Sequence, residues 1–184
     1  MALHRIFSGL LLALLATMAS AAERQFKLDG GETLSINAGT DWIQGKLPEN
    51  SPYGTVTLHG PDSTIWRLTL MPLPPDPTMS GDPGNLRIYV RNLARAIEDS
   101  GSQVNEEQIA LEGVAMRGFY FKVHDSRPKP KAQVQEQEMG EYVDGYMGAL
   151  SVNSKVYLFD VLWNKGGEVA AKNALATLKT ARIK

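Results

Sequence analysis

The sequence predicts an α+β fold in which helices cover an antiparallel β-sheet on both faces, an α/β/α sandwich. The segment from Val156 to Trp163 is apolar on both of its faces apart from Asp160. A strand with one face in water alternates apolar and polar residues, so this strand belongs in the middle of a covered sheet. Consecutive strands are joined by short turns, which is typical of antiparallel pairing. Two helical segments suffice to cover the two faces.

The first residues have the pattern of a secretory signal peptide. Arg5 supplies a positive charge, residues 6–16 are an apolar run of 11 residues, and Ala19-Ser20-Ala21 offers the small residues of a cleavage site. The run is shorter than the roughly 20 residues that a membrane span needs. We therefore expect a signal peptide at residues 1–21, one soluble domain at residues 22–184 and a periplasmic or secreted location without a membrane span.

Hydrophobic patterning and turn residues predict the strands of this domain. Turns are indicated at Asp29-Gly30-Gly31, at residues 60–63, at Glu112-Gly113 and at Asn153-Ser154. Trp42 and Ile43 are expected to pin an irregular segment, residues 37–52, to the core. The predicted strands are residues 24–28, 32–36, 55–59, 64–71, 103–111, 114–124, 142–150 and 156–163.

Two helices complete the predicted domain. The first has Asp82 as its N-cap, Pro83 at its first position and Gly101 just past its end. The second covers residues 168–180, which are rich in good helix formers. Prolines make residues 72–84 a surface loop, and residues 125–138 form a second, polar loop.

The composition leaves few residues from which to build a catalytic site. The chain has no cysteine, so disulfides and thiol chemistry are excluded. The two histidines of the domain, His59 and His124, lack partners at metal-ligand spacing, and no metal or other cofactor is predicted. A net charge of −1 gives no electrostatic signal for nucleic acid.

Asp160 is the sharpest single candidate for chemistry. In a central strand, burial would raise the pKa of its carboxyl group and make it a candidate acid. The alternative is a structural carboxylate that pairs with a basic residue or caps backbone donors. A glycosidase-type pair would need a second carboxylate nearby, for which Asp144 is the candidate. A hydrolase would combine Asp160 with His59 or His124.

The best candidate binding surface is a row of arginines on the first helix. Arg87, Arg91 and Arg95 follow one another at four-residue spacing, so they share one helical face. Three guanidinium groups could bind carboxylates or phosphates of a partner. The alternative is a solvated face, paired with Glu98 or Asp99. The basic, proline-containing segment 127–131 offers a similar choice between a partner-binding strand and a solvated loop.

Three stretches resemble PsbP-like proteins. Residues 32–42 resemble the apolar–polar–apolar–Pro–x–Gly–Trp opening of that superfamily, with Ala38 in place of the proline and Asp41 as an extra residue. Residues 114–121 resemble its central aromatic strand. Residues 157–163 and the final helix resemble its closing unit.

The PsbP-like superfamily includes the extrinsic photosystem subunit, a Ran-binding nuclear import factor and exported bacterial proteins such as DcrB. The resemblance covers most of residues 24–180. It implies an α/β/α sandwich and a non-enzymatic role that depends on binding a partner. No catalytic set is shared within the superfamily, so the resemblance assigns no functional residue.

Taken together, these observations favour an exported accessory or interaction protein of the cell envelope that is not an enzyme and binds another envelope protein. A periplasmic carrier of a small molecule or lipid is the first alternative, with a pocket between the sheet and a helix near Trp42, Trp66 or Trp163. A hydrolase that uses Asp160 is the second. The sequence does not determine the oligomeric state.

Overall fold

A computed structural model gives the structure of the chain and describes residues 21–28, 31–47, 50–76, 78–79, 82–126 and 142–184. The predicted signal peptide, apart from Ala21, and the basic segment 127–131 lie outside the described residues. The described elements are β1 (Ala21–Lys27), β2 (Thr33–Gly39), β3 (Ile43–Gln44), β4 (Val56–His59), β5 (Trp66–Pro72), α1 (Pro83–Asp99), β6 (Gln103–Glu112), β7 (Met116–His124), β8 (Asp144–Val152), β9 (Lys155–Trp163), α2 (Glu168–Leu178) and β10 (Arg182–Ile183).

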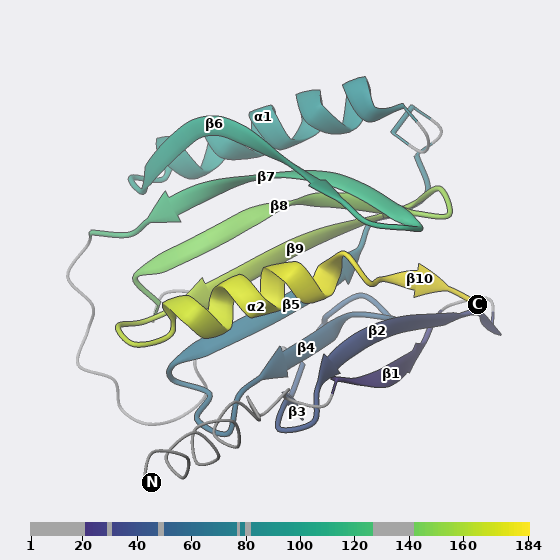
Figure 1. Cartoon of the computed structure of the whole chain (residues 1–184). Helices are drawn as coiled ribbons and strands as arrows, with labels where there is room; N and C mark the ends of the chain where they lie inside the picture. The colour runs from purple at the N-terminus through teal and green to yellow at the C-terminus, as the bar shows by residue number, and fades with distance from the viewer. Residues whose placement is uncertain (1–20, 29–30, 48–49, 77, 80–81, 127–141) are drawn as a thin grey trace, which may run out of the picture.

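The strands form two antiparallel sheets (Figure 1). The larger sheet has seven strands in the order β3-β4-β5-β9-β8-β7-β6, and the smaller has three in the order β1-β2-β10. The predicted α+β class with antiparallel pairing is confirmed. The prediction of one sheet is wrong, because the predicted hairpin of β1 and β2 forms a separate sheet, in which β2 also pairs with β10.

The β8–β9 hairpin lies at the centre of the larger sheet, as predicted. β9 pairs with β8 on one side and with β5 on the other. Asn153 and Ser154 form the turn with positive φ values of 47° and 65°, the conformation that two-residue hairpin turns require. Gly148 is needed on β8, because a Cβ atom there would collide with the carbonyl oxygen of Phe119 on β7. A glycine at this position therefore lets β7 and β8 approach closely.

Helix α1 begins and ends where the sequence predicts. The Asp82 side chain accepts a hydrogen bond of 2.7 Å from the Gly84 amide, and Pro83 opens the helix. Gly101 follows the helix with a φ of 96°, a conformation that glycine adopts without strain. The buried stripe of α1 joins a cluster with β7, β8 and β9, composed of Leu86, Val90, Ala94, Phe121, Val123, Ala149 and Val156.

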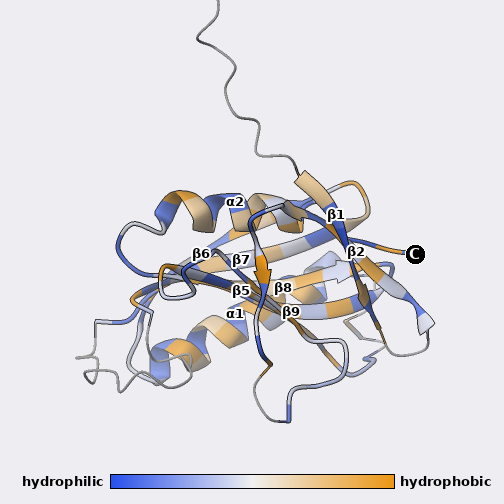
Figure 2. Cartoon of the chain, turned by 90° about the horizontal axis from the view of Figure 1, so that it is seen from below, coloured by the Kyte–Doolittle hydropathy of each residue, from blue (hydrophilic) through white to orange (hydrophobic). Residues whose placement is uncertain are grey.

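Helix α2 belongs to a second, larger core cluster. Its buried residues pack with side chains of β1, β2 and β5 and with one face of β9. They are Ala171, Ala174, Leu175 and Leu178. In Figure 2 the two helices are seen apart from each other, with strands of the larger sheet between them. Because successive side chains of a strand alternate between faces, the apolar residues of β9 contribute to both clusters.

Several local predictions are corrected by the structure. Ile43 does not pin its segment to the core, since 45% of it is exposed, whereas Trp42 is buried as predicted. The final helix ends at Leu178, and the short strand β10 follows it. Val114 lies in an exposed turn, so β7 begins at Met116. Pro72 still belongs to β5, where it is the register partner of Tyr157.

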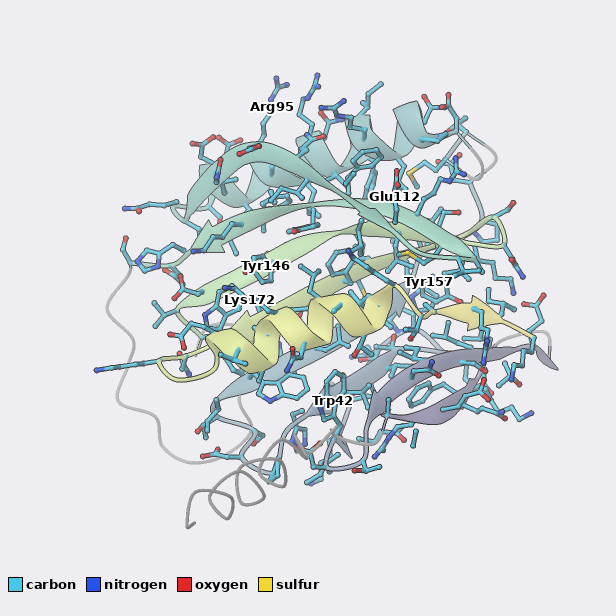
Figure 3. All side chains as sticks on the ribbon, in the orientation of Figure 1. Trp42, Arg95, Glu112, Tyr146, Tyr157 and Lys172 are labelled. Carbon is cyan, nitrogen blue, oxygen red and sulfur yellow. The ribbon has the colours of Figure 1, made fainter. Side chains whose placement is uncertain are left out.

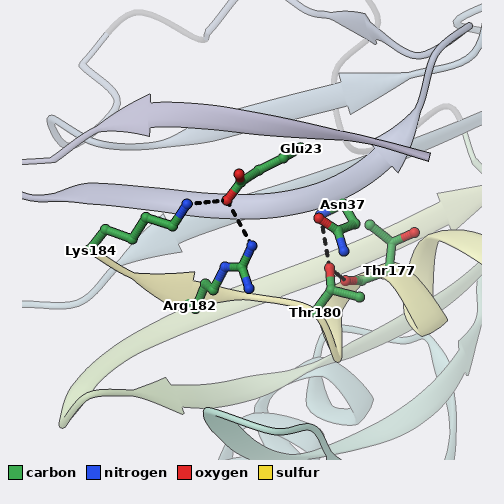
Figure 4. A network of polar contacts seen from close by, with 6 residues as sticks. All are labelled: Glu23, Asn37, Thr177, Thr180, Arg182 and Lys184. Atoms are coloured by element: carbon green, nitrogen blue, oxygen red, sulfur yellow. Dashed lines mark hydrogen bonds and ion pairs between the residues drawn. The ribbon is translucent and has the colours of Figure 1, made fainter.

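Polar contacts tie the two ends of the described chain together (Figure 4). The Glu23 carboxylate accepts hydrogen bonds from Lys184 Nζ at 2.6 Å and from Arg182 Nη2 at 2.9 Å. Next to them, the backbone amide of Asn37 donates a hydrogen bond of 2.9 Å to Thr180 Oγ1. These contacts hold β10 and the end of α2 against the β1–β2 hairpin.

Candidate functional site

The three arginines of the predicted row are exposed on α1. Leu86, Val90 and Ala94 face the core from the same helix, and the three arginines lie on its exposed side. Figure 3 shows Arg95 pointing outward from the molecule. Within the described residues, no carboxylate forms an ion pair with any of the three arginines, and this applies to Glu98 and Asp99 as well.

Arg87 contacts the sheet at one end of this row. Its guanidinium carbon lies 5.8 Å from the centroid of the Phe119 ring on β7, within the range of a cation–π contact. Such a contact holds Arg87 above the aromatic ring while its charge stays exposed. The row is therefore anchored to the sheet at the N-terminal end of α1.

A cavity of about 260 Å³ lies beside the same phenylalanine. It is formed by the first turn of α1 and the end of the β6–β7 hairpin. Arg117 and Glu112 are register partners across the two strands, and both line the cavity. The full lining is Pro83, Ala110, Glu112, Gly113, Met116, Arg117, Gly118 and Phe119.

A second cavity, of about 380 Å³, lies between the proline-rich loop and α1. Its lining is mostly apolar and consists of Leu73, Pro74, Pro75, Asp76, Met79 and Tyr89. The Asp76 carboxylate is held within its own loop by hydrogen bonds from the amide and hydroxyl of Thr78. Those two bonds lower the pKa of Asp76, so the carboxylate stays charged at the edge of this cavity.

Asp160 has a partly buried carboxyl group with a raised pKa, as its central strand predicts. Burial raises the pKa to about 6, although the charge of Arg67 and the hydroxyl of Thr69 oppose the increase. Thr69 lies directly opposite Asp160 on β5. Asp160 Oδ1 is shut off from solvent and has no hydrogen-bond partner within the described residues. Asp160 is thus a poorly solvated carboxyl group beside an arginine.

The register contradicts the idea that Asp144 pairs with Asp160. Met147 is the residue of β8 opposite Asp160, whereas Asp144 lies opposite Trp163. Residues 160 and 163 differ by an odd number of positions, so the two carboxylates project from opposite faces of the sheet. They cannot flank one substrate bond.

The two histidines are also separated by the sheet. His124 shares the face of Asp144, and its Nδ1 lies 3.0 Å from Asp144 Oδ1, with both side chains partly exposed. His59 lies on the same face as Asp160 but two strands away, opposite Arg67. Its Nδ1 is engaged with the carbonyl oxygen of Gly60 at 2.5 Å. The structure brings neither histidine next to Asp160 in the sheet register.

The tryptophans proposed to line a carrier pocket are core residues. Trp42, Trp66 and Trp163 are each at most 9% exposed, and the rings of Trp42 and Trp66 meet edge to face at 4.7 Å. Neither of the two cavities described above is lined by a tryptophan.

In the described ranges, no group of three or more histidine, aspartate or glutamate side chains is arranged to hold a metal ion. Among the same residues, neither helix is long and apolar enough to cross a membrane.

Comparison with known proteins identifies the fold. No protein-family model matches the chain, and no curated protein matches it. The solution structure of cyanobacterial PsbP (CyanoP) from Synechocystis sp. PCC 6803 matches it with a TM-score of 0.51. The match covers 94% of this chain and 99% of the cyanobacterial one, at 11% sequence identity. The chain has a PsbP-like fold.

Sequence patterns found the polar residues of this PsbP-like fold but not the cavity beside Phe119. The arginine row follows from four-residue spacing alone. The cavity arises where the first turn of α1 meets the β6–β7 hairpin, a contact between segments about 30 residues apart that no local pattern encodes. The available signal was the alternation of Arg117 and Phe119, which places a charge and a ring on one face of β7.

Proposed function

We propose that this protein is a non-catalytic accessory protein of the cell envelope that acts by binding another envelope protein. The observation that carries the proposal is the exposed row of Arg87, Arg91 and Arg95 on α1. A row of guanidinium groups without ion pairs among the described residues is suited to carboxylates of a partner. The PsbP-like fold supports the same role, because the resemblance to PsbP-like proteins implies partner binding rather than catalysis.

The proposal includes export and an α/β/α arrangement. The signal-peptide pattern of residues 1–21 supports export. The assignment of α1 and α2 to two different core clusters supports a sandwich with one helix on each face of the larger sheet. The export prediction is tested by fractionating the host cell and measuring the mass of the mature protein. A mature chain that starts at Ala22 in the envelope or medium is expected, and an intact chain in the cytoplasm would contradict it.

The binding role is tested by cross-linked co-purification from the native cell envelope. The wild-type chain is compared with the variant R87E/R91E/R95E, after circular dichroism has shown that the variant folds. The matched control is K165E/K172E/K179E, which makes the same change of charge on exposed residues in and beside α2. We expect a partner with the wild type and the control but not with the arginine variant.

Each result of that comparison has a defined meaning. A partner captured equally by all three chains would keep the accessory role and reject the arginine row. A partner lost from both variants would indicate a general effect of charge rather than a site. Failure of the wild type to capture any partner would contradict the proposed function.

A further inference from the structure

The arginine row and the cavity beside Phe119 form one continuous surface. Arg87 belongs to the row, and its guanidinium group lies over the ring that lines the cavity. Arg117 reaches the same cavity from β7. Next to Arg87 on α1, Ile88 is 54% exposed and adds an apolar contact area. Thus the surface combines a hollow with a partly apolar wall, an apolar neighbour and several positive charges.

We propose that this surface binds an acidic segment of a partner protein that inserts one apolar, preferably aromatic, side chain into the cavity. The inference rests on the proposed function and gives the chemistry of the partner. Its carboxylates would face Arg87 and Arg117 at the cavity and then Arg91 and Arg95 along α1. We call the cavity, the three arginines of α1 and Arg117 together the acidic-anchor surface, because they would hold the acidic segment and its anchoring side chain.

The size of the cavity favours a single side chain over a free small molecule. Its volume of about 260 Å³ lies below the roughly 300–1,000 Å³ that is typical of small-molecule pockets. Protein interfaces are commonly held by a few aromatic or arginine residues that fill pockets of this kind. The apolar part of the wall consists of Pro83, Ala110, Met116 and Phe119, which suits a buried ring or aliphatic chain.

The length of the arginine row favours an extended segment. Arg87 and Arg95 are eight residues apart, which is about 12 Å along an α-helix. An extended chain advances about 3.3–3.6 Å per residue, so about four residues of a partner would span the row. A small ligand held in the cavity would leave Arg91 and Arg95 unused.

The charges at the cavity favour an anionic partner. Arg87 and Arg117 are positive, and Glu112 is the carboxylate in the lining. Because Glu112 is the cross-strand partner of Arg117, it offsets one positive charge and leaves that of Arg87. Arg91 and Arg95 extend the positive charge away from Glu112. The exposed Asp82 carboxylate beside Pro83 is a second negative charge near the cavity, so the excess of positive charge lies along the row, where an acidic segment would meet Arg91 and Arg95.

The inference is tested by adding a defined peptide probe to the full protein, in the form in which it is purified from the host cell. The probe is the capped pentapeptide Glu-Asp-Phe-Asp-Glu, with two controls, one with alanine in place of phenylalanine and one with the four acids replaced by their amides. Affinity is measured by calorimetric titration, and the contact site by amide chemical shifts. Binding is expected to weaken about ten-fold without the ring and about five-fold or more without the charges.

Matched variants locate the binding on the chain. R87E and R117E are expected to weaken the pentapeptide about five-fold or more, whereas K172E, which reverses an exposed charge on α2 outside this surface, should change it less than about two-fold. A110F fills the cavity from its exposed rim and should abolish binding. I109F places the same side chain on the other face of β6 and should leave binding unchanged. A110L serves if A110F fails to fold.

The proposal is overturned if the wild type does not bind the acidic phenylalanine peptide at millimolar concentration. It is also overturned if A110F or A110L binds the peptide as well as the wild type does, or if K172E has the same effect as R87E. Adding A110F to the cross-linking comparison separates this inference from the proposed function. A partner retained by A110F but lost from R87E/R91E/R95E would support the accessory role and reject the cavity. If the wild type captures no partner, the accessory role fails and the peptide titration alone decides the inference.

Discussion

At the scale of single residues, Asp160 has the most unusual chemistry in the described chain. A carboxylate on a central strand loses contact with water, and burial penalises its charged form more than Arg67 and Thr69 favour it. The register places Asp144 on the other face of the sheet, so a carboxylate pair is absent at this point. Ionisation of Asp160 in the folded chain therefore costs stability.

The raised pKa predicts how stability depends on pH. The pKa of Asp160 rises from 3.8 to about 6 on folding, so the native state keeps a proton that the unfolded chain has already lost between these values. The contribution of Asp160 to the free energy of unfolding is greatest below about pH 4 and falls as the pH rises to about 6, by about 3 kcal/mol at most. The variant D160N has no carboxyl group to ionise at this position, so it does not lose stability in this pH range. We expect urea unfolding to show a more stable variant at pH 8 and a flatter profile between pH 4 and 6.

Asp62 provides a control, because its effect on stability changes with pH in the opposite direction to that of Asp160. The hydroxyl and amide of Thr64 donate hydrogen bonds to its carboxylate and lower its pKa from 3.8. The bonds stabilise the fold above that value, and the contribution is lost as the pH falls through the lowered pKa. D62N should therefore be less stable than the wild type at pH 8 and equal to it in strong acid. If D160N is destabilised at pH 8 or keeps the slope of the wild type, the account of Asp160 is wrong.

At the scale of elements, α1 is positioned by its first turn. The cap formed by Asp82 satisfies the Gly84 amide, one of the donors that a helix leaves unpaired at its start. Pro83 follows the cap and lines the cavity beside Phe119. The same turn thus begins the helix and forms one wall of the acidic-anchor surface.

Removal of this cap should be measurable in stability and in binding. D82A should lower the free energy of unfolding by about 1 kcal/mol, because the Gly84 amide loses its partner. D82S, which keeps a capping oxygen, should recover most of the loss. D99A at the other end of α1 is the matched control, because that carboxylate caps no amide and lies at the helix end where negative charge is unfavourable. A D82A chain as stable as the wild type in urea would show that Asp82 does not hold the turn.

At the scale of the whole molecule, local patterns predicted the elements better than their partners. Alternation identified the strand around Trp66, segments that are apolar on both faces identified the strands around Phe121 and Phe159, and the pair Asp82-Pro83 marked the start of α1. The strands β3 and β10 are two residues long and carry no pattern. The pairing of β2 with β10 depends on contacts across most of the chain, which periodicity does not contain.

In the candidate site too, local features could be predicted from the sequence, and features that depend on how elements pack could not. The arginine row depends on spacing within one helix, and the sequence shows it directly. The separation of Asp144 from Asp160 depends on the register of two strands, where a shift of one residue exchanges the faces of every side chain. The cavity depends on how a helix end packs against a hairpin. Features within one element were therefore predictable, and features between elements were not.

The closure of the chain ends, meaning the contacts that hold β10 against the β1–β2 hairpin, gives a last prediction for the whole molecule. β10 has only two residues, and the amide and carbonyl groups of Lys184 and Thr33 bond reciprocally at 2.9 and 3.1 Å. The hydrogen bonds from Lys184 and Arg182 lower the pKa of Glu23 from 4.5 to about 2. This carboxylate therefore stabilises the closure above pH 4.5, and the contribution is lost as the pH falls toward 2.

The variant E23Q should release β10 at neutral pH while leaving the larger sheet intact. Hydrogen exchange at pH 7 is expected to be faster at the amides of Thr33 and Lys184 than in the wild type, with unchanged protection on β8 and β9. E107Q, on the edge strand β6, removes an exposed charge far from this closure and should not alter those amides. As the pH falls below about 2, the wild type and E23Q should converge in stability, because the wild-type carboxyl group then becomes protonated. Equal exchange in E23Q and the wild type at pH 7 would mean that backbone pairing alone holds the C-terminal strand.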